Sequence, residues 1–342
     1  MIALLKSEHR LTKNNLQIIA CAGSGKTEFV STRIAFLVAE SLAKPENIVA
    51  FTFTERAAKE LKFRIRAKIR ELIGHQPDIG DLYVGTIHSF CYELLKEFVP
   101  GHRAYDVLDE GKRYSFISAI MHELGYKNLK GWLESEGKRK TFGVTPQTWV
   151  LNTLIRSIDI SREEMIPPDK ISSCETFTEA VCRYDAKLHE RRYLDFSSMM
   201  SLTVQYLESD KQFRDAVRGR FTYITVDEYQ DVNPIQERLI NLMTGPKNNL
   251  CVVGDDDQSI YQWRGSTVEN ILTFKERYKN IFTHHLPTNY RSSDNIIKLS
   301  NSFIKKNLRR LSKEMKPSDK KAEKGDVYKI DFQEQRDEIA FM

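Results

Sequence analysis

Short apolar runs alternate with amphipathic stretches over the first hundred residues. The apolar runs have the length and β-branched content of buried strands: Leu16 to Ala20, Ile48 to Phe53 and Leu82 to Gly85. The amphipathic stretches predict helices over Glu28 to Ala39, from a Thr54 N-cap to about Ile73, and over Phe90 to Phe98. This alternation predicts right-handed βαβ units and a parallel sheet.

The pattern becomes mainly helical from about Gly101 to Asp195. Helices are expected over Gly111 to Leu124, Thr145 to Ile158 and Phe177 to His189. The sheet pattern then returns with strands over Phe221 to Val226, Leu250 to Val253 and Ile281 to Leu286, and a helix over Pro234 to Met243. The fold class predicted is α/β, with a discontinuous domain of residues 1–100 and 195–290 and a helical insertion of residues 101–194.

The last fifty residues are more polar. A helix rich in basic residues is expected beyond Arg291, with Lys298, Lys305, Lys306, Arg309 and Arg310. A final apolar run, Val327 to Phe332, reads as a strand for which the chain supplies no partner. Residues 291–342 are therefore predicted to be a linker and the start of a second domain of the same kind.

A glycine-rich turn, Ala20-Cys-Ala-Gly-Ser-Gly-Lys-Thr27, joins the first strand to the first helix. Strand, glycine loop, Lys-Thr and helix are the parts of a phosphate-binding P-loop, and the helix points its positive end at the phosphates. Lys26 can reach the β- and γ-phosphates, and the Thr27 hydroxyl can ligate Mg²⁺. The expected nucleotide-binding residues are Ala22, Gly23, Ser24, Gly25, Lys26, Thr27 and Glu28.

Two adjacent carboxylates, Asp227 and Glu228, end the strand that starts near Phe221. In a P-loop enzyme, an acid at the end of a neighbouring strand holds Mg²⁺, and a second acid can orient and deprotonate the attacking water. Asp227 fits the first role and Glu228 the second. A solvated acidic turn is the simpler alternative.

The next strand runs into Gly254-Asp-Asp-Asp-Gln-Ser-Ile-Tyr-Gln-Trp-Arg-Gly265. Gln258 is a candidate contact to the γ-phosphate. Tyr261, Trp263 and Arg264 offer aromatic faces and a cation, which suit the bases of a single nucleic-acid strand. Two alternatives remain open: the aromatic residues belong to the core, or the three aspartates form a separate metal site.

Three further stretches lie where strands end. Arg291 is a candidate contact to the γ-phosphate, and Tyr290 could stack on an adenine. Hydroxyl groups and an aromatic ring that can grip a nucleic-acid backbone and its bases are supplied by Thr52, Phe53, Thr86 and His88. A structural role is the alternative for His88.

Composition adds little to this picture. The formal net charge of +5 permits a polyanionic partner without requiring one. The five cysteines show no metal-ligand spacing and read as reduced thiols of a cytoplasmic protein. The sequence contains no apolar run of the roughly 20 residues that span a bilayer, so no membrane association is expected.

In order, these stretches resemble the motifs of the UvrD/Rep-like superfamily 1 DNA helicases, over about Leu16 to Ser293. AGSGKT, FTFTERAAKEL and GTIHSFC look like motifs I, Ia and Ib; VDEYQD, GDDDQSIYQWRGS and NYRSS look like motifs II, III and IV. The resemblance implies a RecA-like motor domain that uses ATP and Mg²⁺ to move 3′-to-5′ along single-stranded DNA. It assigns ATP to Lys26, Thr27, Asp227, Glu228, Gln258 and Arg291, and DNA to Phe53, His88, Tyr261 and Trp263.

The sequence departs from the family pattern in three places. Met1 to Lys6 contain no glutamine of the kind that reads adenine, and Glu28 replaces the arginine that often follows the P-loop threonine. Motifs V and VI are absent, so the chain is expected to be the ATP-binding half of a longer motor, acting on single-stranded DNA and its junctions with duplex, with a nuclease or repair protein as a possible partner. Alternatives are a DNA-sensing ATPase subunit of a nuclease or phage-defence complex, a non-hydrolysing DNA-binding module, and a small-molecule P-loop kinase.

Overall fold

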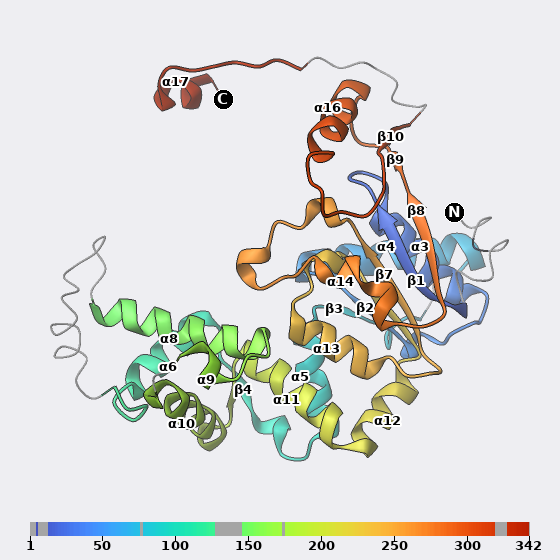
Figure 1. The fold of residues 1–342 in the computed structure, drawn as a ribbon. Coiled ribbons are helices and arrows are strands. Elements are labelled where there is room, and N and C mark those ends of the chain that lie inside the picture. Colours follow the sequence, from blue (N-terminus) through green and yellow to red (C-terminus); the bar gives the residue numbers. More distant parts are fainter. Residues whose placement is uncertain are drawn as a thin grey trace.

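A six-stranded, all-parallel sheet forms the centre of the computed structural model, which describes residues 5, 13–75, 78–126, 146–172, 175–318 and 327–341 (Figure 1). The strand order is β3-β2-β6-β7-β1-β8. The strands are β1 (Asn15–Ala20), β2 (Ile48–Phe51), β3 (Tyr83–Gly85), β6 (Tyr223–Val226), β7 (Asn249–Gly254) and β8 (Ile281–Leu286). The predicted parallel sheet is confirmed.

Helices cover both faces of the sheet. Strand β2 shows how its side chains divide, because Ile48 and Ala50 enter one apolar cluster while Val49 and Phe51 enter the other. The first cluster lies under α3 (Lys26–Ala39) and α4 (Glu55–Ile73). The second lies under α5 (Ile87–Phe98), α11 (Phe196–Ser209), α12 (Lys211–Arg220), α13 (Pro234–Met243), α14 (Glu269–Leu272) and α15 (Phe274–Arg277). Burial on both faces explains why the strands read as continuous apolar runs.

Threonine caps fix the starts of α4 and α5, and the sequence predicts the first of the two caps. The Thr54 hydroxyl accepts a hydrogen bond from the Ala57 amide at 3.1 Å and caps α4. Helix α5 starts three residues earlier than expected, because Thr86 accepts from the Ser89 amide and caps it. Both caps place their threonines at the edge of the sheet where the strands end.

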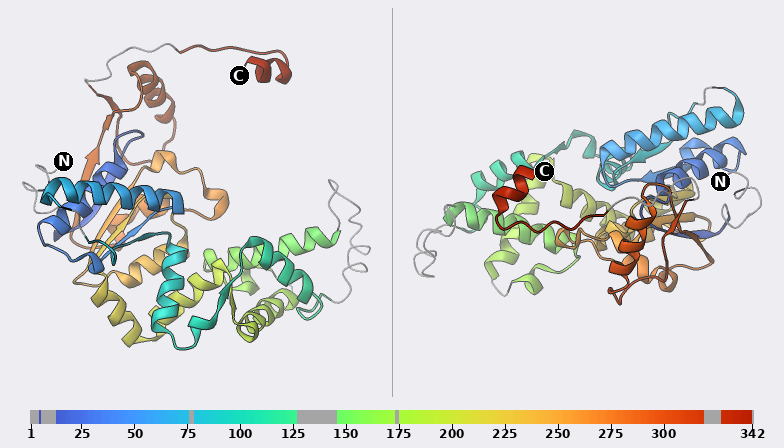
Figure 2. Two further views of the ribbon diagram at one scale, coloured as in Figure 1. Left: turned by 180° about the vertical axis from the view of Figure 1, so that it is seen from behind. Right: turned by 90° about the horizontal axis from the view of Figure 1, so that it is seen from above.

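The segment between α5 and α11 forms a separate helical layer with its own apolar core (Figure 2). A two-residue parallel pair, β4 (Asp106–Val107) with β5 (Tyr193–Leu194), ties its two ends together. Its helices are α6 (Glu110–Ile120), α8 (Pro146–Glu163), α9 (Pro168–Ile171) and α10 (Glu175–Arg191). The fold class is thus α/β with a mainly helical insertion, as the sequence predicts; its exact domain boundaries stay a prediction.

A buried carboxylate joins the insertion to the sheet domain. Asp195 caps α11 and is fully buried. It pairs with Arg113 from α6 at 2.9 Å and with Arg162 from α8 at 3.1 Å, and it accepts from Tyr184 Oη of α10 at 2.6 Å. Burial alone would raise the pKa of Asp195, but the two guanidinium groups outweigh it and hold that pKa at about 2.

The C-terminal part differs from the sequence prediction. Helix α16 (Asp294–Ile304) contains Lys298 but ends before the other predicted basic residues, Lys305, Lys306, Arg309 and Arg310. The chain then folds back, and β10 (Lys316–Pro317) pairs with β9 (Thr288–Asn289). The predicted strand over 327–332 is wrong: those residues form no strand and lead into α17 (Gln335–Phe341). A strand needs a neighbour for its backbone hydrogen bonds, which an apolar run alone does not provide.

Among the described residues, no helix combines the length and apolar character that crossing a bilayer requires.

Candidate functional site

The carboxyl ends of the parallel strands bring the predicted nucleotide residues to one edge of the sheet. The glycine-rich turn follows β1, Asp227 and Glu228 follow β6, and the three aspartates follow β7. Strands β6, β7 and β1 are consecutive neighbours in the sheet. Segments more than two hundred residues apart therefore meet at a single site.

The turn after β1 has the backbone of a phosphate loop. Gly23 and Gly25 have φ angles of 63° and 87°, which a side chain would strain. Helix α3 begins at Lys26, so its first amides face the loop. The Ser24 hydroxyl oxygen is buried and has no hydrogen-bond partner among the described residues. A buried polar atom beside free helix amides fits a bound phosphate group.

Lys26 and Glu228 meet directly across the edge of the sheet. Lys26 Nζ lies 2.6 Å from Glu228 Oε2. Glu228 has a φ of 52°, a left-handed conformation that is unusual for a residue with a side chain. The Glu228 amide donates to Asp227 Oδ1 at 3.0 Å. Asp227 and Glu228 are therefore held by specific contacts within the protein and do not form a solvated acidic turn.

Asp227 is half-buried next to the Lys26–Glu228 pair and lines the adjoining cleft. Burial raises its pKa to about 7, and the Glu228 charge adds to the rise. A bound cation would favour the charged form of such a carboxylate. Magnesium that is bound together with nucleotide phosphates needs only one or two protein carboxylates. Asp227 and Thr27, the second residue of α3, would hold the ion.

The segment 289–291 packs on the phosphate loop. Asn289 donates from Nδ2 to the Ala22 carbonyl at 2.9 Å, and the Tyr290 amide donates to the Gly23 carbonyl at 3.0 Å. A Cβ on Gly23 would lie 2.8 Å from Arg291 Cβ, so Arg291 is beside the loop as the sequence predicts. The Tyr290 ring is 58% exposed.

Glu28 and Gln258 are both engaged within the protein. Lys68 of α4 lies 2.5 Å from Glu28 Oε1, so the Glu28 carboxylate faces α4. Gln258 donates from Nε2 to Asp255 Oδ2 at 2.5 Å. Their predicted contacts to nucleotide stay predictions.

The three aspartates after β7 bind protein cations. Lys313 Nζ lies 2.8 Å from Asp255 and 3.2 Å from Asp257, and it also pairs with Asp256. Arg310 makes two hydrogen bonds to Asp257, at 2.8 and 2.6 Å. Lysine at the centre of the cluster excludes the alternative of a separate metal site, and no group of three metal-ligating side chains occurs in the described part of the chain.

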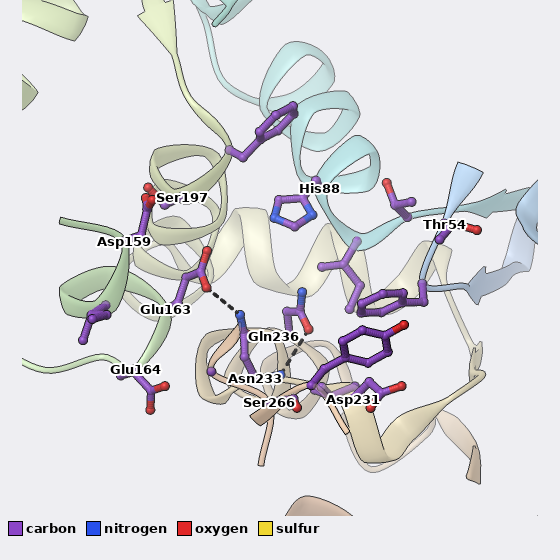
Figure 3. A pocket seen from close by; sticks show the side chains of 18 of the residues that line it. Thr54, His88, Asp159, Glu163, Glu164, Ser197, Asp231, Asn233, Gln236 and Ser266 are labelled. Atoms are coloured by element: carbon purple, nitrogen blue, oxygen red, sulfur yellow. Dashed lines mark hydrogen bonds between the residues drawn. The ribbon is translucent and has the colours of Figure 1, made fainter. Parts of the chain in front are cut away.

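A cleft of about 1330 Å³ separates this edge of the sheet from the helical insertion (Figure 3). The Phe53 and Tyr261 rings stack on each other in it, with centroids 5.1 Å apart and an angle of 23°. Trp263 also lines the cleft and is 69% exposed, so the alternative that Trp263 is a core residue is wrong. Arg264 lies in the short 3₁₀ turn Gln262–Arg264.

The other predicted cleft residues lie around these rings. The Thr52 hydroxyl donates to the Thr54 carbonyl, and the Thr86 hydroxyl contacts Glu55 Oε1 at 2.9 Å, so both hydroxyl groups have partners within the protein. Burial lowers the pKa of His88, which favours its neutral form. All of them line the cleft (Figure 3 labels His88).

The cleft contains residues that the sequence reasoning missed. Phe196, at the start of α11, is 42% exposed, and its ring meets the His88 ring edge-to-face at 5.6 Å. Asp159 and Glu163 of α8, and Glu164 directly after it, line the opposite wall, and Figure 3 shows Glu163 pointing toward Asn233. A phenylalanine directly after an N-cap aspartate carries no motif of its own, so only the fold reveals its place.

Replacing Glu163 with glutamine is expected to stabilise the protein more at pH 8 than at pH 5. Burial raises the pKa of Glu163 to about 7, with the Asp159 charge adding to it. Because the pKa of Glu163 is higher in the folded than in the unfolded protein, its neutral form favours folding. This contribution to the unfolding free energy is fully present below about pH 4.5 and is lost as the pH rises through 7. The loss has an upper limit of about 3 kcal/mol. Urea unfolding at both pH values measures it.

The matched control for this prediction is Glu179→Gln, an exposed carboxylate on α10 of the same insertion. An effect of Glu163→Gln that has the same size at pH 5 and pH 8 would contradict the assignment.

Comparison with known proteins agrees with this geometry. The model of the family described as UvrD/REP helicase N-terminal domain matches residues 5–279. The protein named ATP-dependent DNA helicase PcrA from Bacillus subtilis (strain 168) is 32% identical over 315 residues, covering 90% of this chain and 39% of its own length. PcrA of Staphylococcus epidermidis (strain ATCC 12228) is 33% identical over 313 residues, 89% of this chain and 40% of its own length.

PcrA of Staphylococcus aureus (strain NCTC 8325) is 32% identical over 336 residues, which cover 97% of this chain and 43% of the relative. The chain thus spans about two fifths of the length of the curated relatives it matches. The family match covers most of the chain, including the P-loop, the carboxylate pair and the aromatic cleft. The chain belongs to the UvrD/REP helicase N-terminal domain family.

Proposed function

We propose that this chain forms the ATP-binding half of an ATP-dependent DNA helicase that moves 3′-to-5′ along single-stranded DNA. The observation that carries the proposal is the position of the Lys26–Glu228 pair, 2.6 Å apart, at the same sheet edge as the Phe53–Tyr261–Trp263 cleft. A phosphate site and a base-stacking surface on one edge are the two parts that a DNA motor must couple. The cytoplasm, where such a motor finds DNA, is the proposed location.

Each residue of the nucleotide site has a separate role in the proposed hydrolysis of ATP. Magnesium and ATP, when bound, supply the phosphoryl group and the charge that polarises it. Lys26 and Arg291 neutralise charge on the phosphates, while Thr27 and Asp227 hold the metal. Glu228 accepts a proton from water, since its carboxylate lies at the strand end beside Lys26. A second motor half would complete the cleft around them.

The cleft suits a single strand and not a duplex. Its stacked pair and exposed indole offer flat apolar faces, and base–aromatic stacking contributes about 1–3 kcal/mol per base. The bases of the strand would lie against these aromatic rings. The opposite wall carries Asp159, which pairs with Arg113 at 2.7 Å, and the guanidinium group of Arg156, so it presents charges of both signs. We propose single-stranded DNA and its junctions with duplex as partners.

The test is binding of Mg·ATP and of a dT oligonucleotide by the chain and by Lys26→Ala, with ATPase rates measured with and without DNA. We expect both ligands to bind, and Lys26→Ala to weaken Mg·ATP binding by about 100-fold, as loss of a charge-assisted contact in a closed site would do. Lys44→Ala, which removes an exposed lysine, is the control and should bind normally.

Failure to bind the oligonucleotide at low salt, where phosphate contacts are strongest, would contradict a DNA motor and favour the alternative of a small-molecule P-loop kinase. DNA-stimulated hydrolysis without strand displacement by the complete protein would favour a DNA-sensing ATPase subunit of a nuclease or phage-defence complex.

A further inference from the structure

The Gln230 side chain lies between the nucleotide site and the aromatic cleft. It belongs to the short 3₁₀ turn Tyr229–Asp231 after β6 and is 1% exposed. Its Nε2 donates to Glu228 Oε2 at 2.9 Å and to Asp231 Oδ2 at 3.3 Å. Its Oε1 accepts from the Asp255 amide at 3.0 Å. One side chain thus contacts both strand ends.

The orientation of this amide follows from its partners. Two carboxylate oxygens accept on one side and a backbone N–H donates on the other, so the reversed amide would bring its oxygen against two carboxylates. The approach is also close, because a Cβ on Gly254 would lie 2.7 Å from Gln230 Oε1. Glycine at the end of β7 therefore permits the contact.

The two ends of the amide lead to different parts of the site. Glu228 pairs with Lys26 on the nucleotide side. Asp255 starts the segment that continues through the 3₁₀ turn Asp256–Gln258 to Tyr261 and Trp263 in the cleft. The Ser259 hydroxyl donates to the backbone carbonyl of Gln230 at 3.5 Å, which is a second contact between Gln230 and the same segment.

We propose that Gln230 is a positioning residue that couples the nucleotide site to the aromatic segment of the cleft. A change in the position of the Glu228 carboxylate, as nucleotide engages Lys26, shifts the amide and with it the Asp255 amide at the base of that segment. The inference rests on the proposed function for the identity of the cleft's ligand. The coupling itself concerns residues of this chain and can be measured without DNA.

Trp263 provides the probe. The sequence has three tryptophans, so Trp132→Phe with Trp149→Phe leaves Trp263 as the only one. We expect Mg·AMP-PNP, a non-hydrolysable ATP analogue, to change the Trp263 emission of this parent protein. In the Gln230→Met variant, an analogue with a fluorescent ribose should still bind, while the Trp263 response is lost.

The matched control is Gln17→Met. Gln17 is another glutamine of 1% exposure, on β1, and its amide donates to the Ile271 carbonyl and not to the nucleotide site. It should keep the Trp263 response. If Gln230→Met does not fold, Gln230→Glu keeps the acceptor for the Asp255 amide but removes both donors, and it should lose the response as well.

A second readout connects the coupling to DNA. Mg·AMP-PNP should change the affinity of the parent protein for a dT oligonucleotide by about 5-fold or more, a typical size for coupled sites, and by less than about 2-fold in Gln230→Met. If the parent shows the Trp263 response but binds no DNA, the proposed function fails and the coupling stands.

Three results would overturn the coupling. They are an unchanged Trp263 response in Gln230→Met, an equal loss in Gln17→Met, and no response of Trp263 to bound nucleotide in the parent.

Discussion

Replacing Glu228 with glutamine is expected to slow ATP hydrolysis by about 100-fold or more, the usual contribution of a general base, while Mg·ATP affinity changes by no more than a few-fold. Glutamine keeps the shape of the side chain and an oxygen that can accept from Lys26 and Gln230, which now lie 2.6 and 2.9 Å from Oε2. It removes the carboxylate that we propose as the acceptor of a proton from water. Single-turnover hydrolysis by the complete motor, beside equilibrium nucleotide binding, separates the two effects.

The control for this prediction is Glu208→Gln on α11, an exposed carboxylate paired with Arg238 away from the sheet edge. Its hydrolysis rate should match that of the unchanged protein. A Glu228→Gln protein that hydrolyses ATP at the normal rate would remove Glu228 from the role of base, and Asp227 or Asp231 would then have to be tested.

The Asp195→Ala variant is expected to lose about 3–5 kcal/mol of unfolding free energy, as happens when one partner of a buried ion pair is removed. Arg113 and Arg162 would then lie buried without the carboxylate that they share, and the Tyr184 hydroxyl and the first turn of α11 would lose an acceptor. Because Asp195 joins three helices of the insertion to α11, the change should loosen the cleft wall as well. Urea denaturation measures the loss.

Asp210→Ala is the matched control, because Asp210 caps α12 through the Gln212 and Phe213 amides but is exposed. It should cost about 1 kcal/mol, the usual value for a cap. Equal losses for the two variants would show that Asp195 acts only as a cap. The stabilisation by Asp195 should also fall as the pH drops toward its pKa of about 2, since protonation removes the charge that the two arginines share.

The core strands could be predicted because each is a separate apolar run with its own flanking turn. Helix α11 was missed for the opposite reason. Helix α11 begins Phe-Ser-Ser-Met-Met-Ser-Leu-Thr-Val and is packed against α5, α12 and α13, so its apolar and small residues show no clear solvent face. The run over 327–332 has the composition of a strand, but pairing depends on a neighbour that composition does not specify.

The parts of the candidate nucleotide site could be recognised in the sequence because the P-loop and the carboxylate pair are each contiguous. Gln230, Lys313 and Phe196 could not be placed in this way. Gln230 contacts Asp255, twenty-five residues away, and Lys313 contacts the same aspartate from the far side of α16. Such partners are set by the strand order of the sheet. The sequence therefore reveals candidate groups that are contiguous in a motif, but not the distant residues that hold them in place.

The ion pairs of Arg310 and Lys313 determine how far this chain could be shortened from its C-terminal side. A protein ending after α16 would lose both cations that now neutralise Asp255, Asp256 and Asp257, and three adjacent carboxylates would repel one another at the base of the aromatic segment. It would also lose β10, which pairs with β9. The smallest piece suitable for expression, crystallisation or domain exchange should therefore extend at least to Ser318, although residues 305–315 form no regular helix or strand.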